Sequence, residues 1–150
     1  MGVLSNLTEE IKNAMLAKDS VKLESLRAIK SAVLLAETSS GSSGKLSDQE
    51  AIKLLQRLVK QRKDSASIFK EQNRLDLAEP EEAQAKVISA FLPTQFTNEE
   101  IESTIAVIIE TIEANGMKDM GKVMGIASKK LEGKADGKRI SDIVKKKLGA

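Results

Sequence analysis

The sequence contains no cysteine, histidine, tryptophan or tyrosine, and its only aromatic residues are three phenylalanines. Without cysteine the chain can form neither disulfides nor thiolate metal sites. Without histidine it lacks the commonest metal ligand and the usual general base at neutral pH. We therefore expect no catalytic residues, no metal site and no cofactor.

Long hydrophobic runs are missing as well. No apolar stretch approaches the roughly 20 residues that a membrane-spanning helix requires. The N-terminal stretch MGVLSNLTEEIKNAM carries acids early and has no apolar core of the kind found in secretory signals. We therefore expect a soluble, cytoplasmic protein that does not act at a membrane.

The charge is nearly balanced but unevenly distributed. The net charge is +2. Residues 79–117 hold eight acids and one lysine, whereas residues 118–150 hold ten lysines and arginines and four acids. Basic tails often bind polyanions. The tail is therefore where a binding surface is expected.

Apolar residues recur three and four positions apart along most of the chain, which predicts an all-α fold. Two capping boxes mark helix starts, one from Ser47 to Glu50 and one from Thr97 to Glu100. The stretch TSSGSSGK at 38–45 is a flexible loop by composition. Helices are expected to begin near residues 4, 20, 47, 76 (or 79, with Pro80 at the first position), 97, 119 and 136.

Pro93 divides the chain, because proline ends a helix and biases the residue before it toward an extended conformation. We expect an N-terminal domain over residues 1–92, an antiparallel hairpin or bundle of about four helices. A smaller domain of three helices is expected over residues 96–150. Asp119 and Asp136 are predicted to cap its second and third helices.

The stretch GKVMGIASKKLEGKADGKR at 121–139 combines glycines with lysines. It is not a nucleotide-binding P-loop, because the glycine spacing is too short and no strand precedes it. Gly121 and Gly125 lie one helical turn apart, and each costs about 0.8–1.0 kcal/mol relative to alanine. Either another helix or a nucleic-acid backbone should therefore approach closely. We favour helix packing for Gly125 and a ligand for Gly121, and we expect caps or turns at Gly116, Gly133 and Gly137.

The basic residues around these glycines form a candidate binding surface, and the start of the last helix adds a site that attracts phosphate. The alternative, an ordinary solvated face, stays open. The segment KQRK at 60–63 has the same two interpretations, and there we favour the solvated face. The candidate binding residues are Gly121, Lys122, Gly125, Lys129, Lys130, Lys134, Lys138, Arg139, Lys145 and Lys146, with Lys147 beside them.

Two longer stretches are distinctive: KQRKDSASIFKEQNRLDLAEPEEAQAKVISAFLP and MKDMGKVMGIASKKLEGKADGKRISDIVKKKL. The first resembles the KQR…S…F…R-x-D-L-A…E…LP segment of the GatB/YqeY family. The second resembles the C-terminal motif of that family, with its G-x-A-D-G-[KR] turn. The resemblance extends from about Leu4 to Leu148. Asn73 stands where the family usually has glycine, and Gln84 where it usually has an acid.

Stand-alone members of this family resemble the helical tail of GatB, a component of the tRNA-dependent amidotransferases, which convert Glu-tRNA(Gln) or Asp-tRNA(Asn) to the amide forms. In those enzymes the tail holds the tRNA and does not perform the chemistry; a similar module is appended to some glutaminyl-tRNA synthetases. The resemblance therefore implies a tRNA-binding module. Its label as a carbon–nitrogen ligase would then come only from homology to the amidotransferases. The alternative is a helical adaptor for a protein partner, such as a synthetase or a component of an amidotransferase.

The composition narrows the mode of RNA recognition. Stacking platforms for single-stranded bases need exposed aromatic side chains, and the sequence offers three phenylalanines, two of them on apolar helical faces. Recognition is therefore expected to depend on the shape and the phosphate backbone of folded RNA. No DNA target is expected.

Overall fold

The computed structural model describes residues 2–39 and 44–149, so that residues 40–43 of the predicted loop lie outside it. The described residues contain seven α-helices, one short 3-10 helix and no strand. The prediction of an all-α fold is confirmed. Within the described ranges no helix is both long and apolar enough to cross a membrane.

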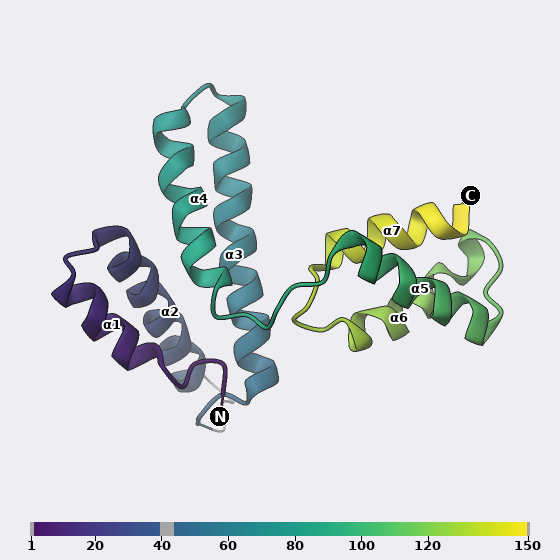
Figure 1. Cartoon of the computed structure of the whole chain (residues 1–150), viewed down its shortest axis with the longest axis horizontal. Helices are drawn as coiled ribbons and strands as arrows, with labels where there is room; N and C mark the ends of the chain where they lie inside the picture. Colours follow the sequence, from purple (N-terminus) through teal and green to yellow (C-terminus); the bar gives the residue numbers. More distant parts are fainter. Residues whose placement is uncertain (1, 40–43, 150) are drawn as a thin grey trace. The chain divides into compact units, whose positions relative to one another are not determined.

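The chain divides into two compact units, which we call the N-terminal unit (Met1–Pro93) and the C-terminal unit (Thr94–Ala150). In the N-terminal unit α3 and α4 form an antiparallel pair, α4 also packs on α2, and α2 packs on α1 (Figure 1). Its helices are α1 (Leu7–Leu16), α2 (Ser20–Thr38), α3 (Asp48–Glu71) and α4 (Leu75–Ser89).

The core of the N-terminal unit forms where the apolar stripes of these helices meet. Leu26 and Ile29 of α2 belong to one buried cluster with Leu55 of α3 and Ile88 of α4, and all four side chains are inaccessible to solvent. The predicted capping box begins α3, since Ser47 Oγ accepts a hydrogen bond from the Glu50 amide at 3.2 Å. Pro80 lies inside α4 rather than at its first position, so the earlier of the two predicted starts is the right one.

The C-terminal unit contains three α-helices and one 3-10 helix among its described residues. It consists of α5 (Asn98–Ile112), the 3-10 helix η1 (Met117–Asp119), α6 (Met120–Lys130) and α7 (Gly137–Gly149). Each α-helix packs against the other two. The buried cluster between them contains Ile101, Ile105, Ile108, Val123, Ala127, Leu131, Ala135, Ile140, Ile143, Val144 and Leu148. The second capping box is also confirmed, at Thr97 and Glu100.

Two predicted caps in this unit are wrong, although α6 does begin directly after Asp119. Gly116 does not end α5, because the helix stops at Ile112 and Glu113 takes the left-handed conformation, with φ of 53°. The Asp119 side chain does not cap α6. Its carboxylate accepts instead from the Asn115 amide at 2.8 Å, which satisfies a backbone donor in the turn before η1.

The C-terminal unit is expected to fold alone, because its buried cluster is drawn entirely from its own helices. A fragment of residues 94–150 should have the circular dichroism of a helical protein and a cooperative melt. A fragment that starts at Thr97 is the matched control and should melt earlier, since it loses the Gln95 and Phe96 hydrogen bonds to the turn before α7. A disordered 94–150 fragment would contradict the division at Pro93.

Candidate nucleic-acid interface

Helix α6 carries five of the candidate binding residues, and four of them share one exposed face. The spacing of three and four residues places Gly121, Lys122, Gly125 and Lys129 on adjacent turns of that face. All four are exposed. We call this set the α6 face. Lys130 follows Lys129 by about 100° around the helix and so lies beside the α6 face rather than on it.

The two glycines of the α6 face are not packing glycines. A Cβ atom added at Gly121 or Gly125 would meet no atom of the described chain within 4 Å. The prediction that Gly125 packs against another helix is therefore wrong. Periodicity indicated a close approach, but it could not indicate whether the approaching surface belongs to this chain.

The cations of α6 are not neutralised by acids of the same helix, since Met120–Lys130 contains three lysines and no acid. Lys122 and Lys129 have no ion-pair or hydrogen-bond partner among the described residues. Helix α5 has the opposite character, with four glutamates and no base between Asn98 and Ile112. The C-terminal unit therefore exposes one strongly basic helix and one strongly acidic helix.

The turn between α6 and α7 is formed as the glycines predict. Gly133 takes a left-handed φ of 79°, which glycine adopts at little cost. Asp136 Oδ1 accepts from the Arg139 amide at 3.1 Å, so the predicted cap of α7 is confirmed. Lys138 is exposed in the first turn of α7, where unpaired backbone amides favour anions.

Arg139 is held by the protein itself. Its Nη2 donates to the Phe96 carbonyl oxygen at 2.8 Å and to Asn98 Oδ1 at 2.9 Å, across more than 40 residues of sequence. The Phe96 amide donates in turn to the Lys134 carbonyl oxygen at 2.8 Å. The Lys134 ammonium group lies 5.2 Å from the centre of the Phe96 ring, within the range of a cation–π contact.

These contacts fasten the start of α5 to the turn before α7, and we call them the Phe96 clamp. They give Arg139 and Lys134 a structural role that sequence reasoning missed. One local signal was available: Phe96 and Ile101 flank the start of α5 with the spacing of a hydrophobic staple. That signal placed Phe96 against the core, but it did not indicate its partners in the turn.

The remaining candidates are on the second half of α7. Lys145 and Lys146 are exposed, and Lys146 lies 3.9 Å from a Glu102 carboxylate oxygen of α5. Asp142 is exposed one turn before them. The face of α7 is therefore mixed in charge, and the α6 face together with Lys138 forms the more basic part of the C-terminal unit.

The R-x-D-L-A motif lies where α3 turns into α4. Asn73 takes a left-handed φ of 58°, which explains how it stands where the family usually has glycine, since asparagine tolerates this conformation better than most residues. Arg74 donates two hydrogen bonds of 3.0 Å to Asp76 and holds the pKa of that carboxyl below its ordinary value. Gln84 Oε1 of α4 accepts a hydrogen bond from Arg62 Nε of α3 at 3.0 Å. The amide therefore makes this contact at a position where the family usually has an acid. The motif therefore shapes the hairpin.

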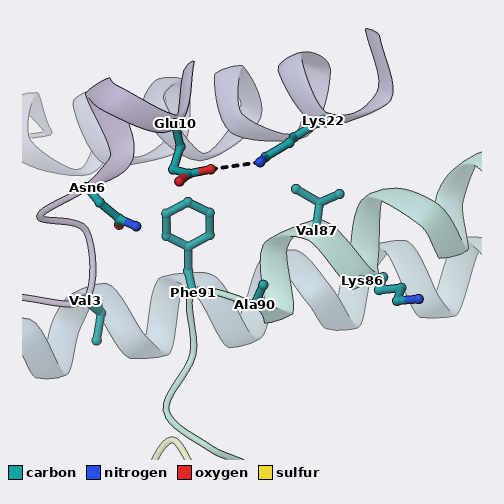
Figure 2. Close-up of a pocket in the computed structure, with 8 residues that line it drawn as sticks. All are labelled: Val3, Asn6, Glu10, Lys22, Lys86, Val87, Ala90 and Phe91. Carbon is teal, nitrogen blue, oxygen red and sulfur yellow. Dashed lines mark ion pairs between the residues drawn. The ribbon is translucent and has the colours of Figure 1, made fainter. Parts of the chain in front are cut away.

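A pocket of about 560 Å³ opens in the N-terminal unit, lined by Val3, Asn6, Glu10, Lys22, Lys86, Val87, Ala90 and Phe91. The Phe91 ring points into it from the end of α4, below the ion pair of Glu10 and Lys22 (Figure 2). The two charges are 2.8 Å apart, and the Glu10 carboxylate raises the pKa of Lys22 through a hydrogen bond and through its charge. The lining has no hydroxyl or thiol group, and its one carboxylate is paired with Lys22. The pocket is suited to binding an apolar group rather than to catalysis.

Comparison with known proteins gives a family match over nearly the whole chain. Residues 4–148 match the family described as Yqey-like protein. Two similar proteins are both named "Altered inheritance of mitochondria protein 41, mitochondrial". The protein from Pyrenophora tritici-repentis is 30% identical over 99% of this chain and 82% of its own length. The protein from Clavispora lusitaniae is 34% identical over 75% of this chain and 66% of its own length.

A third relative has a different kind of name. It is a glutamyl-tRNA(Gln) amidotransferase component from Thermococcus gammatolerans, and it is 41% identical over 73 residues. The match covers 46% of this chain but only 12% of the amidotransferase component. The similarity therefore concerns a short segment of that protein.

The expectation of a cytoplasmic location is contradicted by these names. The two similar fungal proteins are called mitochondrial, which points to mitochondria rather than to the cytoplasm. The expectation depended on the missing secretory signal and the lack of apolar runs. Neither feature bears on a mitochondrial address, which is a different kind of signal from the apolar secretory one.

Proposed function

The chain belongs to the Yqey-like protein family, and on that premise we propose that it is a binding module for folded tRNA. The α6 face, with Lys138 at the start of α7, contacts the phosphate backbone. The proposal extends the resemblance to the tail of the amidotransferases. It assigns no amide chemistry to the chain, which has no cysteine and matches only a small part of the amidotransferase component.

The single observation that carries the proposal is the open space above Gly121 and Gly125. Each glycine costs a helix about 0.8–1.0 kcal/mol relative to alanine, and nothing in the described chain occupies the room that they leave. A smooth strip flanked by Lys122 and Lys129 allows a sugar–phosphate chain to approach the helix closely. The lysines then neutralise phosphates on either side of the strip.

The character of the α6 face favours folded RNA over single strands. It offers glycines and lysines but no aromatic side chain, so it has no platform on which an unpaired base could stack. Contacts to phosphates and ribose hydroxyls across a duplex recognise shape. The rigid double-helical arms of tRNA are ligands of that kind.

Binding of total tRNA to the intact chain at two salt concentrations tests the proposal. We expect affinity to fall steeply between about 50 and about 200 mM salt, because each neutralised phosphate releases counterions. A single-stranded RNA of equal length should compete poorly. Equal competition by the single strand, or no binding at low salt, would contradict the proposal.

Gly125→Ala separates the role of the glycine in binding from its effect on folding. The added methyl group meets open space, so the variant should be more stable by about 0.5–1 kcal/mol through its higher helix propensity. The same methyl group should weaken tRNA binding, since it holds the backbone of the RNA away from the helix. Urea unfolding and tRNA titration of the same preparation measure both effects. Gly149→Ala is the matched control, because Gly149 is a glycine of α7 at which an added Cβ atom also meets nothing within 4 Å, and it should leave affinity unchanged. If Gly125→Ala bound tRNA as tightly as the wild type or more tightly, the glycine strip would not be part of the interface.

A second candidate function, an adaptor for a protein partner, is favoured by the pocket of the N-terminal unit. Its apolar lining includes Phe91, whose ring is only partly buried (Figure 2). The two functions differ in what Phe91→Ser should change. An adaptor would lose its partner, such as an amidotransferase component or a synthetase in a gel-filtration mixture, while tRNA affinity stays the same.

A further inference from the structure

A second basic surface lies on α3, in the other unit of the chain. Residues 51–63, AIKLLQRLVKQRK, hold five lysines and arginines and no acid. Four of these cations are exposed: Lys53, Arg57, Lys60 and Lys63. The opposite side of the helix is buried in the core through Leu54, Leu55, Leu58 and Val59. The exposed side of this stretch therefore carries basic residues and no acid.

Three of the exposed cations form a row. Lys53, Arg57 and Lys60 are four and three residues apart, so they lie on adjacent turns of one face. The row is about 10 Å long at the rise of an α-helix. A nucleic-acid duplex presents several phosphates over that length.

Arg62 does not belong to this row, although the sequence places it in the same basic run. Its Nε donates to Gln84 Oε1 at 3.0 Å and its Nη1 to the Leu58 carbonyl oxygen at 3.4 Å. It therefore joins α3 to α4. The segment KQRK at 60–63 divides into a structural arginine and two outward lysines, which neither interpretation of the sequence had separated.

The three side chains of the row are exposed. Lys60 pairs with Asp64 at 2.8 Å, but both side chains are more than 60% exposed. Such surface pairs contribute about 0–1 kcal/mol and exchange easily for a phosphate. Arg57 has no ion-pair partner among the described residues.

We propose that the α3 row of Lys53, Arg57 and Lys60 is a second contact surface for the backbone of the same RNA. This inference rests on the proposed function, because the polyanion that it needs is the one bound at the α6 face. The connection between α4 and α5 is short, residues 90–97. Because the chain tethers the two units, a tRNA held by one unit is at a raised local concentration for the other.

The neighbours of the row favour RNA over an anionic membrane. A helix that lies on a bilayer carries bulky apolar side chains beside its lysines. Here the neighbouring positions are Gln56, Gln61 and Asp64, and the one large hydrophobic residue of α3 that is prominently exposed in the described chain, Ile68, lies about two turns beyond Lys60. A polar, basic face of this kind suits a phosphate backbone.

The test compares two triple variants of the full chain with equal net charge. Lys53→Gln, Arg57→Gln and Lys60→Gln together remove the row, and Lys12→Gln, Arg27→Gln and Lys30→Gln remove three exposed cations elsewhere in the N-terminal unit. We expect the row variant to bind tRNA at least about tenfold more weakly at about 50 mM salt. Between about 50 and about 200 mM salt the row variant should also lose less affinity than the wild type. The difference should be up to about 20- to 40-fold, which is the salt effect of three phosphate contacts. The control should stay within about twofold of the wild type.

A gain-of-affinity variant makes the test independent of any folding defect in the triple variant. Asp64→Asn removes the acid beside the row and its ion pair with Lys60, and it should tighten tRNA binding by about two- to threefold. If the two triple variants bind tRNA with equal affinity, or if Asp64→Asn binds it no more tightly than the wild type, the α3 row is not a contact surface. The proposal that the α6 face binds tRNA is not affected by either result. If the wild type binds no tRNA, both proposals fail. Vesicles of anionic lipid that bind the wild type but not the row variant, with tRNA binding unchanged, would also overturn the inference.

Discussion

Replacing Lys122, Lys129 and Lys138 together by glutamate is expected to weaken tRNA binding by roughly 100-fold or more. The three side chains are exposed, and none has a partner in the described parts of the chain, so their charges are available to phosphates. Reversal does more than remove attraction, because three carboxylates placed against a phosphate backbone repel it. The affinity is measured by filter binding at about 100 mM salt, where charges about 10 Å apart still interact.

The same triple variant should melt within a few degrees of the wild type. Exposed substitutions away from special contacts usually change stability by less than about 0.5 kcal/mol each. Glutamate at Lys12, Lys30 and Lys86 gives a control of identical net charge with its changes in the N-terminal unit. A control that loses as much affinity as the α6 variant would mean that binding responds only to total charge, and that the α6 face is not a site.

Arg139→Ala should destabilise the C-terminal unit by about 1.5–3 kcal/mol, the usual range for hydrogen bonds made by a charged group. The variant leaves the Phe96 carbonyl oxygen and Asn98 Oδ1 without their donor, and it releases one side of the Phe96 clamp. Because the unit is small, such a loss is a large part of its total stability. Thermal unfolding followed by circular dichroism measures the effect.

Lys138→Ala is the matched control for Arg139→Ala, one residue away and exposed. It should leave the Tm nearly unchanged and lower the affinity for tRNA. The sequence presents Lys138 and Arg139 as equivalent phosphate ligands. We expect instead that Lys138 contributes to tRNA binding and Arg139 to stability. If Arg139→Ala kept the wild-type Tm and lost tRNA binding as Lys138→Ala does, the clamp would be unimportant and Arg139 would be a ligand.

The parts of the fold that could be predicted are those encoded locally. The capping boxes at Ser47 and Thr97 are written within four residues each, and both form. The buried isoleucines of α5 follow from their spacing. The end of α5 before Glu113 could not be predicted in the same way, because a glutamate in the left-handed conformation has no sequence signature. Gly116 is a residue typical of helix ends, and it indicated the wrong position.

The candidate site was predicted less completely, for a physical reason. Spacing places Gly121, Lys122, Gly125 and Lys129 on one face, but it does not say what lies opposite that face. The packing partner expected for Gly125 is absent from the described chain, and Arg139 donates to a carbonyl oxygen 43 residues away that the sequence did not indicate. Both findings concern tertiary contacts, on which a local pattern carries no information.

A titration of tRNA into the chain, followed by nitrogen–proton correlation NMR, tests the central claim most directly. The amides of Gly121 and Gly125 stand in a region of such spectra characteristic of glycine, and they report on the middle of the α6 face. We expect them, with Lys122, Lys129 and Lys138, to shift early and saturably, while the amides on the exposed side of the acidic helix α5 stay in place. Shifts that are largest on α5, or that leave both α6 glycines unmoved at saturation, would contradict the claim that this face binds the RNA backbone.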